Sequence, residues 1–426
     1  MRITIQNVMA FLPTGESKKV DIAIENDRIK AVGELPAGWV ADRLINGDRK
    51  FAIPGFVNAH THASMTLLRS YADDMELMDW LENKIWPIEA KLTSNDIYWG
   101  AMLAALEMIK SGTTAFADMY GPDMERVAEA VQVSGLRGVL SRGLIGVAPD
   151  SDKKLEENVS LYRDYHGEAN GRIQIMFGPH ALYTCPPDYL KKVSKAASTL
   201  GAEIHIHMSE TRFEIENCLK EYGKRPFAHV ESTGLFENGT LAAHCVHLDE
   251  EDIDIIKKYG IRVAHNPGSN MKLASGTAPV PRLLKEGITV ALGTDGTSSN
   301  NNLDMLEEVN LAAMLHKVVS YDPTAVPAKT ALQMGTVEGA KALGYHDVGK
   351  LEAGQKADIV LLSMKGAAWT PCYDPVSLLV YSANASAADT VIVDGRLLME
   401  KREVLTMDEE KILYEAGKCA DRLVAK

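Results

Sequence analysis

The spacing of hydrophobic positions changes twice along the chain, and these changes divide it into three parts. Residues 1–52 favour short strands, because β-forming side chains alternate or cluster there without a helical period. Turn signals at Pro13-Thr14-Gly15 and Glu25-Asn26-Asp27 separate the runs. The predicted strands cover residues 1–12, 19–24 and 28–32.

The middle part, residues 53–348, alternates short β-rich runs with longer amphipathic stretches. Eight β/α units of this size predict a (β/α)8 TIM-type barrel. A doubly wound open sheet shares the rhythm, but no Gly-x-Gly-x-x-Gly follows the first strand, which weakens a dinucleotide-binding version. The predicted strands are 51–57, 113–119, 137–144, 173–178, 203–208, 240–244, 261–264 and 289–293, and the clearest helices are 97–110, 187–200, 249–259 and 280–286.

The third part, residues 349–426, returns to a β pattern. Short β runs are predicted at 358–362, 378–381 and 390–393, with a hairpin turn at Asp394-Gly395. An amphipathic helix is predicted at 407–424. The first and third parts are therefore expected to form a small β-sandwich domain from both ends of the chain, beside a catalytic barrel.

Composition narrows the classes of function. The 426 residues are 46% hydrophobic, which is enough for a large core, and the net charge of -13 argues against nucleic-acid or anionic-membrane partners. Five scattered cysteines without a Cys-x-x-Cys pair fit reduced thiols rather than a disulfide framework. The sequence has neither the pattern of a signal peptide nor a long apolar run, so a cytoplasmic protein is expected.

Histidines gather where a barrel places its chemistry. Active sites of barrels are built at the C-terminal ends of the strands. Taken singly, His247 and His265 are explained as core or loop histidines. Eight of the twelve histidines lie in or just after predicted strands: His60, His62, His180, His205, His207, His244, His247 and His265.

Two His-x-His pairs are candidates for metal binding. Residues two apart in a strand point to the same face, so His60 and His62 can both reach one cation. The second pair is His205 and His207, and only one of these two histidines is needed as a metal ligand. His207 is nearer to the strand end and is the preferred ligand, whereas His205 is expected to lie deeper as a packed or hydrogen-bonding residue.

Three further polar residues follow strand ends. Glu210 can stand beside a metal-bound water without binding the metal, although alone it would be read as a loop residue. His244 ends the sixth predicted strand, and its neighbour Cys245 lacks the second pair of cysteines that a zinc knuckle needs. Asp295 ends the eighth strand and is the expected carboxylate ligand and base.

This set of side chains predicts a hydrolase. Three imidazoles and a carboxylate suit one Zn²⁺ per subunit, with Fe²⁺ as a second candidate. Such a metal supplies hydroxide at neutral pH. Asp295 is expected to take a proton, Glu210 to pass one to a substrate nitrogen, and His244 to hydrogen-bond the developing oxygen. Loss of ammonia or another leaving group completes the reaction, and no organic cofactor is required.

The motifs resemble the amidohydrolase superfamily and, within it, the 5'-methylthioadenosine/S-adenosylhomocysteine deaminase family. The resemblance covers nearly the whole chain. Related barrels with two metals carry a carboxylated lysine after strand four, where this chain has Gly178-Pro179-His180-Ala181, so one metal is expected. The motifs that carry the resemblance are PGFVNAHTH from Pro54, HMSE from His207, HCVH from His244, GTDG from Gly293, WLE from Trp80, WPIE from Trp86, SRGL from Ser141 and SSNNNLD from Ser298.

The resemblance implies a nucleoside substrate. It implies that Glu89 binds the ribose hydroxyls, that His180 contacts the nucleoside and that Arg142 faces the 5' substituent. From the sequence alone, Glu89 could equally be a helix-surface charge and Arg142 part of a surface ion pair. Members of the family often carry an arginine where this chain has Lys154. Lysine keeps the positive charge but cannot form two parallel hydrogen bonds to a carboxylate, so weaker use of S-adenosylhomocysteine, which has a carboxylate tail, is expected.

The function expected from these residues is hydrolytic deamination of adenosine derivatives: 5'-methylthioadenosine, S-adenosylhomocysteine or adenosine itself. The alternatives are a single-metal amidohydrolase acting on a free purine base, a pterin or a chlorotriazine, and a non-catalytic barrel that serves in assembly. A homo-oligomer is compatible with the sequence. Residues 64–92 are rich in Met, Leu and Trp and predict either a lid or packing on the barrel rim.

Overall fold

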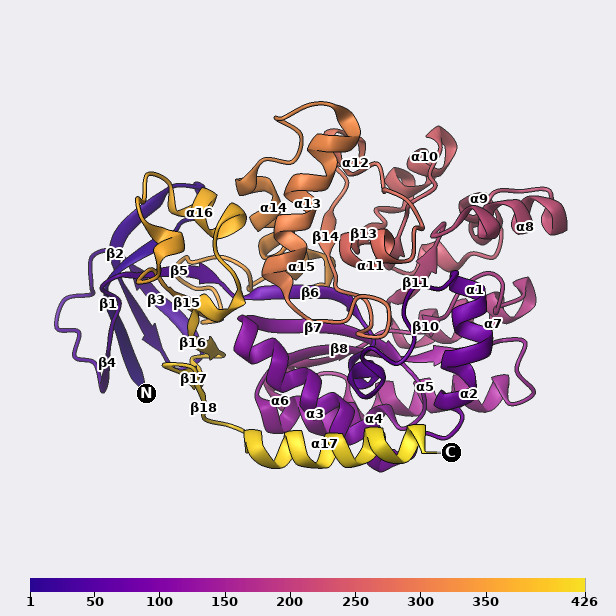
Figure 1. Ribbon diagram of the computed structural model, residues 1–426, viewed down its shortest axis with the longest axis horizontal. Helices are drawn as coiled ribbons and strands as arrows, with labels where there is room; N and C mark the ends of the chain where they lie inside the picture. The colour runs from indigo at the N-terminus through magenta and orange to yellow at the C-terminus, as the bar shows by residue number, and fades with distance from the viewer. Residues whose placement is uncertain (426) are drawn as a thin grey trace.

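Strands from both ends of the chain form one nine-stranded sheet. The computed structural model describes residues 1–425, and Figure 1 shows this sheet at one end of the molecule, beside the barrel. Its path is β18-β17-β16-β15-β5-β1-β2-β3, with β4 paired to β1. The domain boundaries predicted after residues 52 and 348 remain predictions. The strands are β1 (Arg2–Phe11), β2 (Ser17–Glu25), β3 (Arg28–Val32), β4 (Arg43–Asn46), β5 (Lys50–Pro54), β15 (Ile359–Ser363), β16 (Ala388–Val393), β17 (Arg396–Glu400) and β18 (Glu403–Val404).

The remaining strands run parallel and close into a barrel, which confirms the predicted fold class. β9 and β10 both pair with β8 and together occupy the fourth strand position of the barrel. The backbone N–H of His205 donates to the carbonyl of Phe177 (2.8 Å) and joins the fourth strand position to the fifth. The backbone N–H of Asp295 donates to the carbonyl of His60 (2.9 Å) and joins the eighth strand position to the first. The strands are β6 (Phe56–Thr61), β7 (Thr113–Tyr120), β8 (Arg137–Leu144), β9 (Ile173–Ile175), β10 (Gly178–Pro179), β11 (Ile204–Met208), β12 (Thr240–His244), β13 (Arg262–His265) and β14 (Val290–Leu292).

Helices surround the barrel, and α10 illustrates how the sequence sets their ends. Asp249 accepts the backbone N–H of Asp252 (3.0 Å) and Asp252 accepts that of Asp249 (3.1 Å), so two free donors are satisfied at the N-terminus. Gly260 ends the helix with a φ of 61°, a conformation that glycine adopts without strain. The barrel helices are α3 (Ser94–Ser111), α4 (Met124–Ser134), α5 (Ser151–Tyr165), α6 (Glu168–Gly171), α7 (Pro187–Leu200), α8 (Arg212–Tyr222), α9 (Pro226–Glu231), α10 (Glu250–Tyr259), α11 (Pro267–Lys272), α12 (Val280–Lys285), α13 (Met305–Ser320), α14 (Ala328–Met334) and α15 (Val337–Ala342).

The first predicted barrel strand, 51–57, is two strands in the structure. β5 belongs to the nine-stranded sheet and pairs with β15, whereas β6 belongs to the barrel. Gly55 lies between them, and a Cβ there would lie 2.0 Å from the Thr114 hydroxyl, so only glycine fits. Apolar residues continue on both sides of Gly55, and the hydrophobic pattern therefore did not reveal the crossing from one sheet to the other.

The strand predicted at 378–381 is wrong, because these residues lie in helix α16 (Pro375–Tyr381). The Asp374 carboxylate accepts the backbone N–H of Val376 (2.9 Å), and Pro375 occupies the first turn, where its missing N–H costs nothing. The Asp-Pro start of a helix was present in the sequence, but a run of Leu, Val and Tyr resembles a strand equally well.

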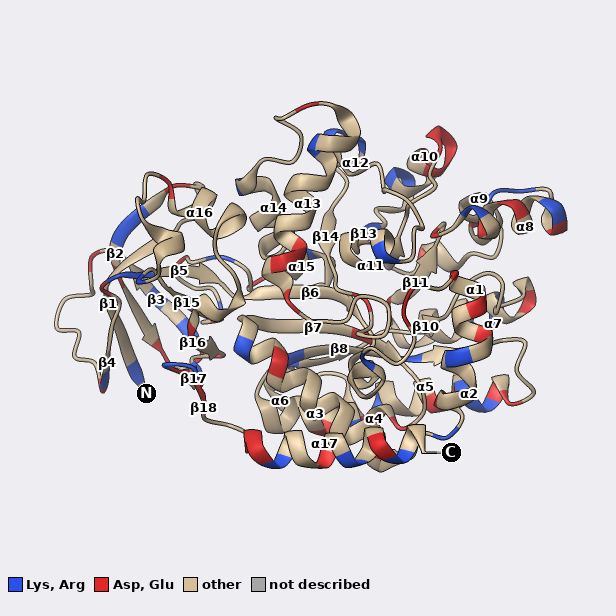
Figure 2. Cartoon of the chain, viewed as in Figure 1, with Lys and Arg blue, Asp and Glu red and all other residues tan. Residues whose placement is uncertain are grey.

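Helix α17 (Glu409–Val424) matches the helix predicted at 407–424 and packs against α3 of the barrel. Lys110 Nζ lies 2.8 Å from both carboxylate oxygens of Glu409 at this contact. Figure 2 shows acidic and basic residues interspersed along α17. Among residues 1–425, no helix is both long and apolar enough to span a membrane.

Candidate active site

A cavity of about 410 Å³ opens at the C-terminal ends of the barrel strands. This volume falls within the range of small-molecule pockets. The candidate metal ligands reach it from separate strands: His62 from the end of β6, His207 from β11 and Asp295 from the turn after β14. The structure therefore brings together residues that are more than 200 positions apart in the sequence.

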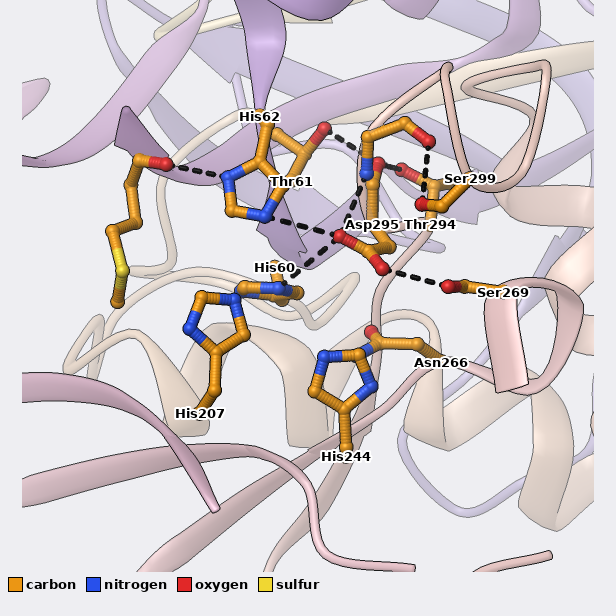
Figure 3. A network of polar contacts seen from close by, with 12 residues as sticks. His60, Thr61, His62, His207, His244, Asn266, Ser269, Thr294, Asp295 and Ser299 are labelled. Atoms are coloured by element: carbon orange, nitrogen blue, oxygen red, sulfur yellow. Dashed lines mark hydrogen bonds and ion pairs between the residues drawn. The ribbon is translucent and has the colours of Figure 1, made fainter. Parts of the chain in front are cut away.

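Five side chains, the four candidate ligands and His244, converge on a point that suits a metal ion. The donor atoms of His60, His62 and His207 lie within 4.8 Å of one another, and the same holds for those of His60, His244 and Asp295. His60 Nε2 is fully buried and has no hydrogen-bond partner among the described residues. A buried nitrogen without a partner, facing other donors, is the form that a metal ligand takes. Figure 3 shows the histidine rings and Asp295 around this point.

Each of the three candidate histidine ligands is held through its Nδ1 atom. His60 Nδ1 lies 2.8 Å from His205 Nε2, His62 Nδ1 contacts the carbonyl of Met119, and His207 Nδ1 lies 2.8 Å from the carbonyl of His180. A carbonyl can only accept, so His62 and His207 each carry a proton on Nδ1, and Nε2 is the nitrogen that would bind a metal. His205 lies behind His60, at the depth expected for it.

Asp295 completes this donor set. Its Oδ1 lies 3.5 Å from His60 Nε2 and 3.1 Å from His62 Nε2. The other oxygen, Oδ2, accepts a hydrogen bond from the Ser269 hydroxyl (2.7 Å), which turns Oδ1 toward the histidines. Three imidazole nitrogens and one carboxylate oxygen are borderline donors that fit a transition-metal ion better than Mg²⁺ or Ca²⁺.

Burial and charge separate the pKa values of these groups. Burial lowers the pKa of His60 to about 4, against the opposing effect of Asp295, and keeps its ring neutral as metal binding requires. Burial also opposes protonation of His62, but the hydrogen bond and charge of Asp295 raise its pKa to about 9. Burial resists ionisation of Asp295, yet His60 and His62 hold its pKa well below the usual range, so this carboxylate stays charged.

Glu210 is the second buried carboxylate of the site and has the opposite tendency. Burial raises its pKa, and the nearby charge of His244 only partly offsets this effect. Glu210 Oε2 lies 3.7 Å from His244 Nε2, and Oε1 accepts a weak hydrogen bond from Ser275 (3.4 Å). The backbone of Glu210 is fixed by Glu214, whose Oε2 accepts its N–H (2.9 Å). When two carboxyl groups of one site differ in this way, the one with the raised pKa is suited to act as the acid and the one that stays charged is suited to act as the base.

The three residues expected to bind substrate all line the cavity. Burial raises the pKa of Glu89, while the neighbouring Tyr120 hydroxyl and the charge of His62 oppose this rise. His180 is held by Thr184 (Nδ1 to Oγ1, 2.9 Å), and burial lowers its pKa to about 4. Arg142 is buried and its Nε donates to Glu157 (2.9 Å), so it both lines the cavity and forms an ion pair.

The segment predicted as a lid or rim forms one wall of the cavity. It consists of η1 (Ala63–Leu68), α1 (Leu77–Trp80), η2 (Leu81–Ile85) and α2 (Trp86–Glu89). Trp80, Leu81 and Ile85 are buried and face the cavity. Lys154 also lines it and forms an ion pair with Asp150. Movement of this wall as a lid stays a prediction.

Three residues near the site were not expected from the sequence. Ser269 and Asn270 lie on α11 and contact Asp295 and His244 respectively, and Tyr120 lines the cavity beside Glu89. The signal available in the sequence was the polar run that follows the seventh strand, because residues after barrel strands build the site. His265, at that strand end, is fully buried against His316.

Similarity to known proteins covers the whole chain. A family model described as the amidohydrolase family matches residues 51–398. A 5-methylthioadenosine/S-adenosylhomocysteine deaminase of Syntrophomonas wolfei is 53% identical over 100% of both chains. A zinc-bound adenosine deaminase of Xanthomonas campestris has a TM-score of 0.94 at 32% identity, over 99% of this chain and 98% of that one.

A third similarity is more distant. A zinc-complexed atrazine chlorohydrolase of Arthrobacter aurescens has a TM-score of 0.91 at 25% identity, over 98% of this chain and 100% of that one. The full-length match at 53% identity places the chain within one branch of the larger family. The chain belongs to the amidohydrolase family and, within it, to the 5-methylthioadenosine/S-adenosylhomocysteine deaminase family.

Proposed function

We propose that the protein hydrolytically deaminates adenine nucleosides, with 5'-methylthioadenosine and S-adenosylhomocysteine as the leading substrates. The observation that carries this proposal is the position of two buried carboxylates in the histidine cluster: Asp295 Oδ1 lies 3.1 Å from His62 Nε2, and Glu210 Oε2, whose pKa is raised by burial, lies 3.7 Å from His244 Nε2. One group is thereby suited to give a proton and the other to take one. The names of the relatives support the nucleoside as the substrate class.

His60, His62, His207 and Asp295 would hold one Zn²⁺ per subunit. The unpartnered Nε2 atom of His60 and the zinc in two similar structures support this choice, with Fe²⁺ as the alternative. When bound, the metal lowers the pKa of water so that a nucleophile exists at neutral pH. Two of the three histidines already direct their Nδ1 protons to backbone carbonyls, so little reorganisation is needed for binding.

The side chains divide the proton transfers of the reaction. Asp295 accepts a proton from the attacking water, and Glu210 donates one to the ring nitrogen next to the carbon under attack. His244 hydrogen-bonds the attacking oxygen. The proton taken by Asp295 then passes to the amino group, which leaves as ammonia. The second proton of the attacking water returns to Glu210 as the ring carbonyl forms. Water and the adenosine derivative are thereby converted into ammonia and the inosine derivative.

The cavity also offers groups for the sugar and its 5' substituent. A carboxylate accepts two hydrogen bonds and so suits the vicinal hydroxyls of a ribose, which supports Glu89 in that role. His180 lies beside the candidate ligand His207, with ring centroids 5.0 Å apart. Arg142 and Lys154 are each already paired with a carboxylate. A free amino-acid carboxylate must compete with these pairs, which favours the uncharged 5' group of methylthioadenosine.

A second candidate is hydrolysis of a free base or a chlorotriazine. The likeness to an atrazine chlorohydrolase supports it, because the same barrel accommodates a ring that has no ribose. The apolar wall of Trp80, Leu81 and Ile85 would suit such a ring as well. The identity of 25% is much lower than that to the nucleoside deaminase, so this activity ranks second.

A substrate panel tests the proposal. Zinc-loaded protein is incubated with methylthioadenosine, S-adenosylhomocysteine, adenosine, guanine and atrazine, and loss of adenine absorbance or release of chloride or ammonia is followed. We expect turnover of the nucleosides, with methylthioadenosine preferred. Removing the metal with a chelator should abolish turnover, and adding zinc should restore it. Turnover of guanine or atrazine above every nucleoside would contradict the proposal.

A further inference from the structure

Helix α11 contributes two adjacent side chains to the site. Ser269 donates to Asp295 Oδ2 (2.7 Å), and the next residue, Asn270, places Oδ1 2.9 Å from His244 Nδ1. The helix itself is anchored from behind, because Glu308 Oε2 accepts the backbone N–H of Gly268 (3.0 Å). One short buried helix therefore orients both the charged carboxylate and the histidine of the site.

Two asparagines approach the same nitrogen of His244. Asn270 offers its oxygen at 2.9 Å, whereas Asn266 offers its Nδ2 at 3.3 Å. If Asn270 is the partner, Nδ1 carries the proton and the lone pair of Nε2 faces the reacting atoms. If Asn266 is the partner, the proton is on Nε2 instead. The shorter contact is to the acceptor, Asn270.

The Nδ2 end of the Asn270 side chain makes no hydrogen bond that would offset the cost of burying it. The residue is fully buried, and its Nδ2 has no hydrogen-bond partner within the described chain. A buried amide half without a partner lowers stability, so an asparagine kept only for the fold would satisfy both ends. Among residues 1–425, the one hydrogen bond of its side chain is that to His244.

We propose that Asn270 is a positioning residue that holds His244 with its proton on Nδ1 and its Nε2 lone pair toward the reacting atoms. This inference rests on the proposed function for its activity assay. His244 Nε2 then accepts a hydrogen bond from the attacking water, which orients the oxygen lone pair toward the carbon. The Asn270 oxygen accepts from Nδ1 whether or not Nε2 gains a proton, so the ring keeps its place throughout the reaction.

Three variants separate the two asparagines. Asn270→Leu keeps the shape but removes the acceptor, Asn270→Asp keeps the acceptor, and Asn266→Asp removes the competing donor. We expect Asn270→Leu to lower kcat by about 10- to 100-fold with KM nearly unchanged. Both aspartate variants should stay much closer to the wild type. The zinc content of each purified variant should remain near one per chain, because none of the changes removes a ligand.

A spectroscopic measurement tests the inference without turnover. In zinc-loaded protein with ¹⁵N-labelled histidine, the His244 signals are identified by their loss in His244→Gln. We expect Nδ1 of His244 to show the shift of a protonated nitrogen and Nε2 that of an unprotonated one. Asn270→Leu should populate both tautomers. If Asn270→Leu does not fold, the tautomer of His244 in the wild type still tests the inference.

The outcomes that would overturn the inference are distinct. Wild-type kcat in Asn270→Leu, or loss of turnover in Asn266→Asp to the same extent as in Asn270→Leu, would show that Asn270 does not hold the ring. A proton on Nε2 in the wild-type spectrum would do the same. If the wild type deaminates no nucleoside, the proposed function fails, and the tautomer of His244 still tests the role of Asn270 alone.

Discussion

His60 Nδ1 lies 2.8 Å from His205 Nε2, so one histidine of the fifth barrel strand orients a histidine of the first. Both side chains are fully buried, and burial lowers the pKa of both, so each ring is neutral. When Nε2 of His60 binds a metal, its proton must be on Nδ1, and His205 Nε2 is then the acceptor. The contact links the packed centre of the barrel to the metal-binding face.

Replacing His205 should therefore weaken metal binding although it is not a ligand. His205→Leu keeps apolar bulk but removes the acceptor, and loss of such a supporting contact typically costs about 10- to 100-fold in metal affinity. Competition with a chromogenic zinc chelator measures the change. The exposed His346 provides the control, since His346→Leu should leave affinity unaltered. Equal zinc affinity in His205→Leu and the wild type would contradict the role assigned to this contact.

Glu89 should decide between nucleosides and free bases. In Glu89→Gln the side chain keeps its size but loses the charge that strengthens hydrogen bonds to a diol, by about 1.5–3 kcal/mol. We expect kcat/KM for methylthioadenosine to fall by roughly 10- to 100-fold, mainly through KM. Turnover of free adenine, however slow, should change little.

A neighbouring residue provides the matched control for Glu89. Glu82 lies in η2 of the same wall but is exposed and does not line the cavity. Glu82→Gln should therefore leave both kinetic constants at wild-type values. An equal loss for adenine and for methylthioadenosine in Glu89→Gln would mean that the carboxylate does not bind the ribose.

The sequence predicted the barrel and the residues at its strand ends because both depend on local periodicity. His60 and His62 are two apart, and a strand necessarily turns both to one face. Asn270 and Ser269 could not be found in this way. Their contacts with His244 and Asp295 depend on where α11 lies, which is set by tertiary packing through Glu308.

The two errors in the fold have the same physical origin. Residues 51–57 are apolar throughout, and the side chain of Thr114, which is distant in sequence, leaves no room for a Cβ at Gly55, where the chain changes sheet. Residues 378–381 are equally compatible with a strand and a buried helix by their hydrophobicity alone. In both cases the deciding contact lies outside the local pattern.

A buried ion pair should dominate the stability of the junction between barrel and nine-stranded sheet. Arg137, at the start of β8, is 2% exposed and binds Asp358 (2.5 Å) and Asp394 (2.5 Å) beside β15 and β16. Arg137→Met leaves the buried Asp358 without its charged partner and leaves Asp394 with only Lys356 (3.2 Å), so the free energy of unfolding should fall by about 3–5 kcal/mol. Urea unfolding measures this loss.

The matched comparison is an exposed pair. Arg282 and Glu250 lie 2.8 Å apart, with side chains 43% and 78% exposed, and such pairs contribute little. Arg282→Met should therefore change the free energy of unfolding by less than about 1 kcal/mol. Arg137→Lys should lie between, because lysine keeps the charge but loses the two-pronged contact. Similar losses for Arg137→Met and Arg282→Met would refute the importance of the buried pair.

The pair of His316 on α13 and His265 should make stability depend on pH. Their Nε2 atoms lie 3.2 Å apart in the core, and burial, helped by the charge of Lys317, lowers the pKa of His316 to about 4. The unfolded chain has the ordinary pKa near 6.5. Between these values the unfolded state binds the extra proton and the folded state does not, so stability present above pH 6.5 is lost as the pH falls toward 4.

His316→Gln should remove this contribution while keeping a polar partner for His265. The free energy of unfolding of the wild type should therefore fall more steeply between pH 7 and pH 5 than that of the variant, by up to about 1.4 kcal/mol per pH unit. Urea unfolding at several pH values measures both slopes. His346→Gln, on the surface, should retain the wild-type slope. Parallel slopes for the wild type and His316→Gln would mean that the buried ring does not stay neutral while the unfolded one is protonated.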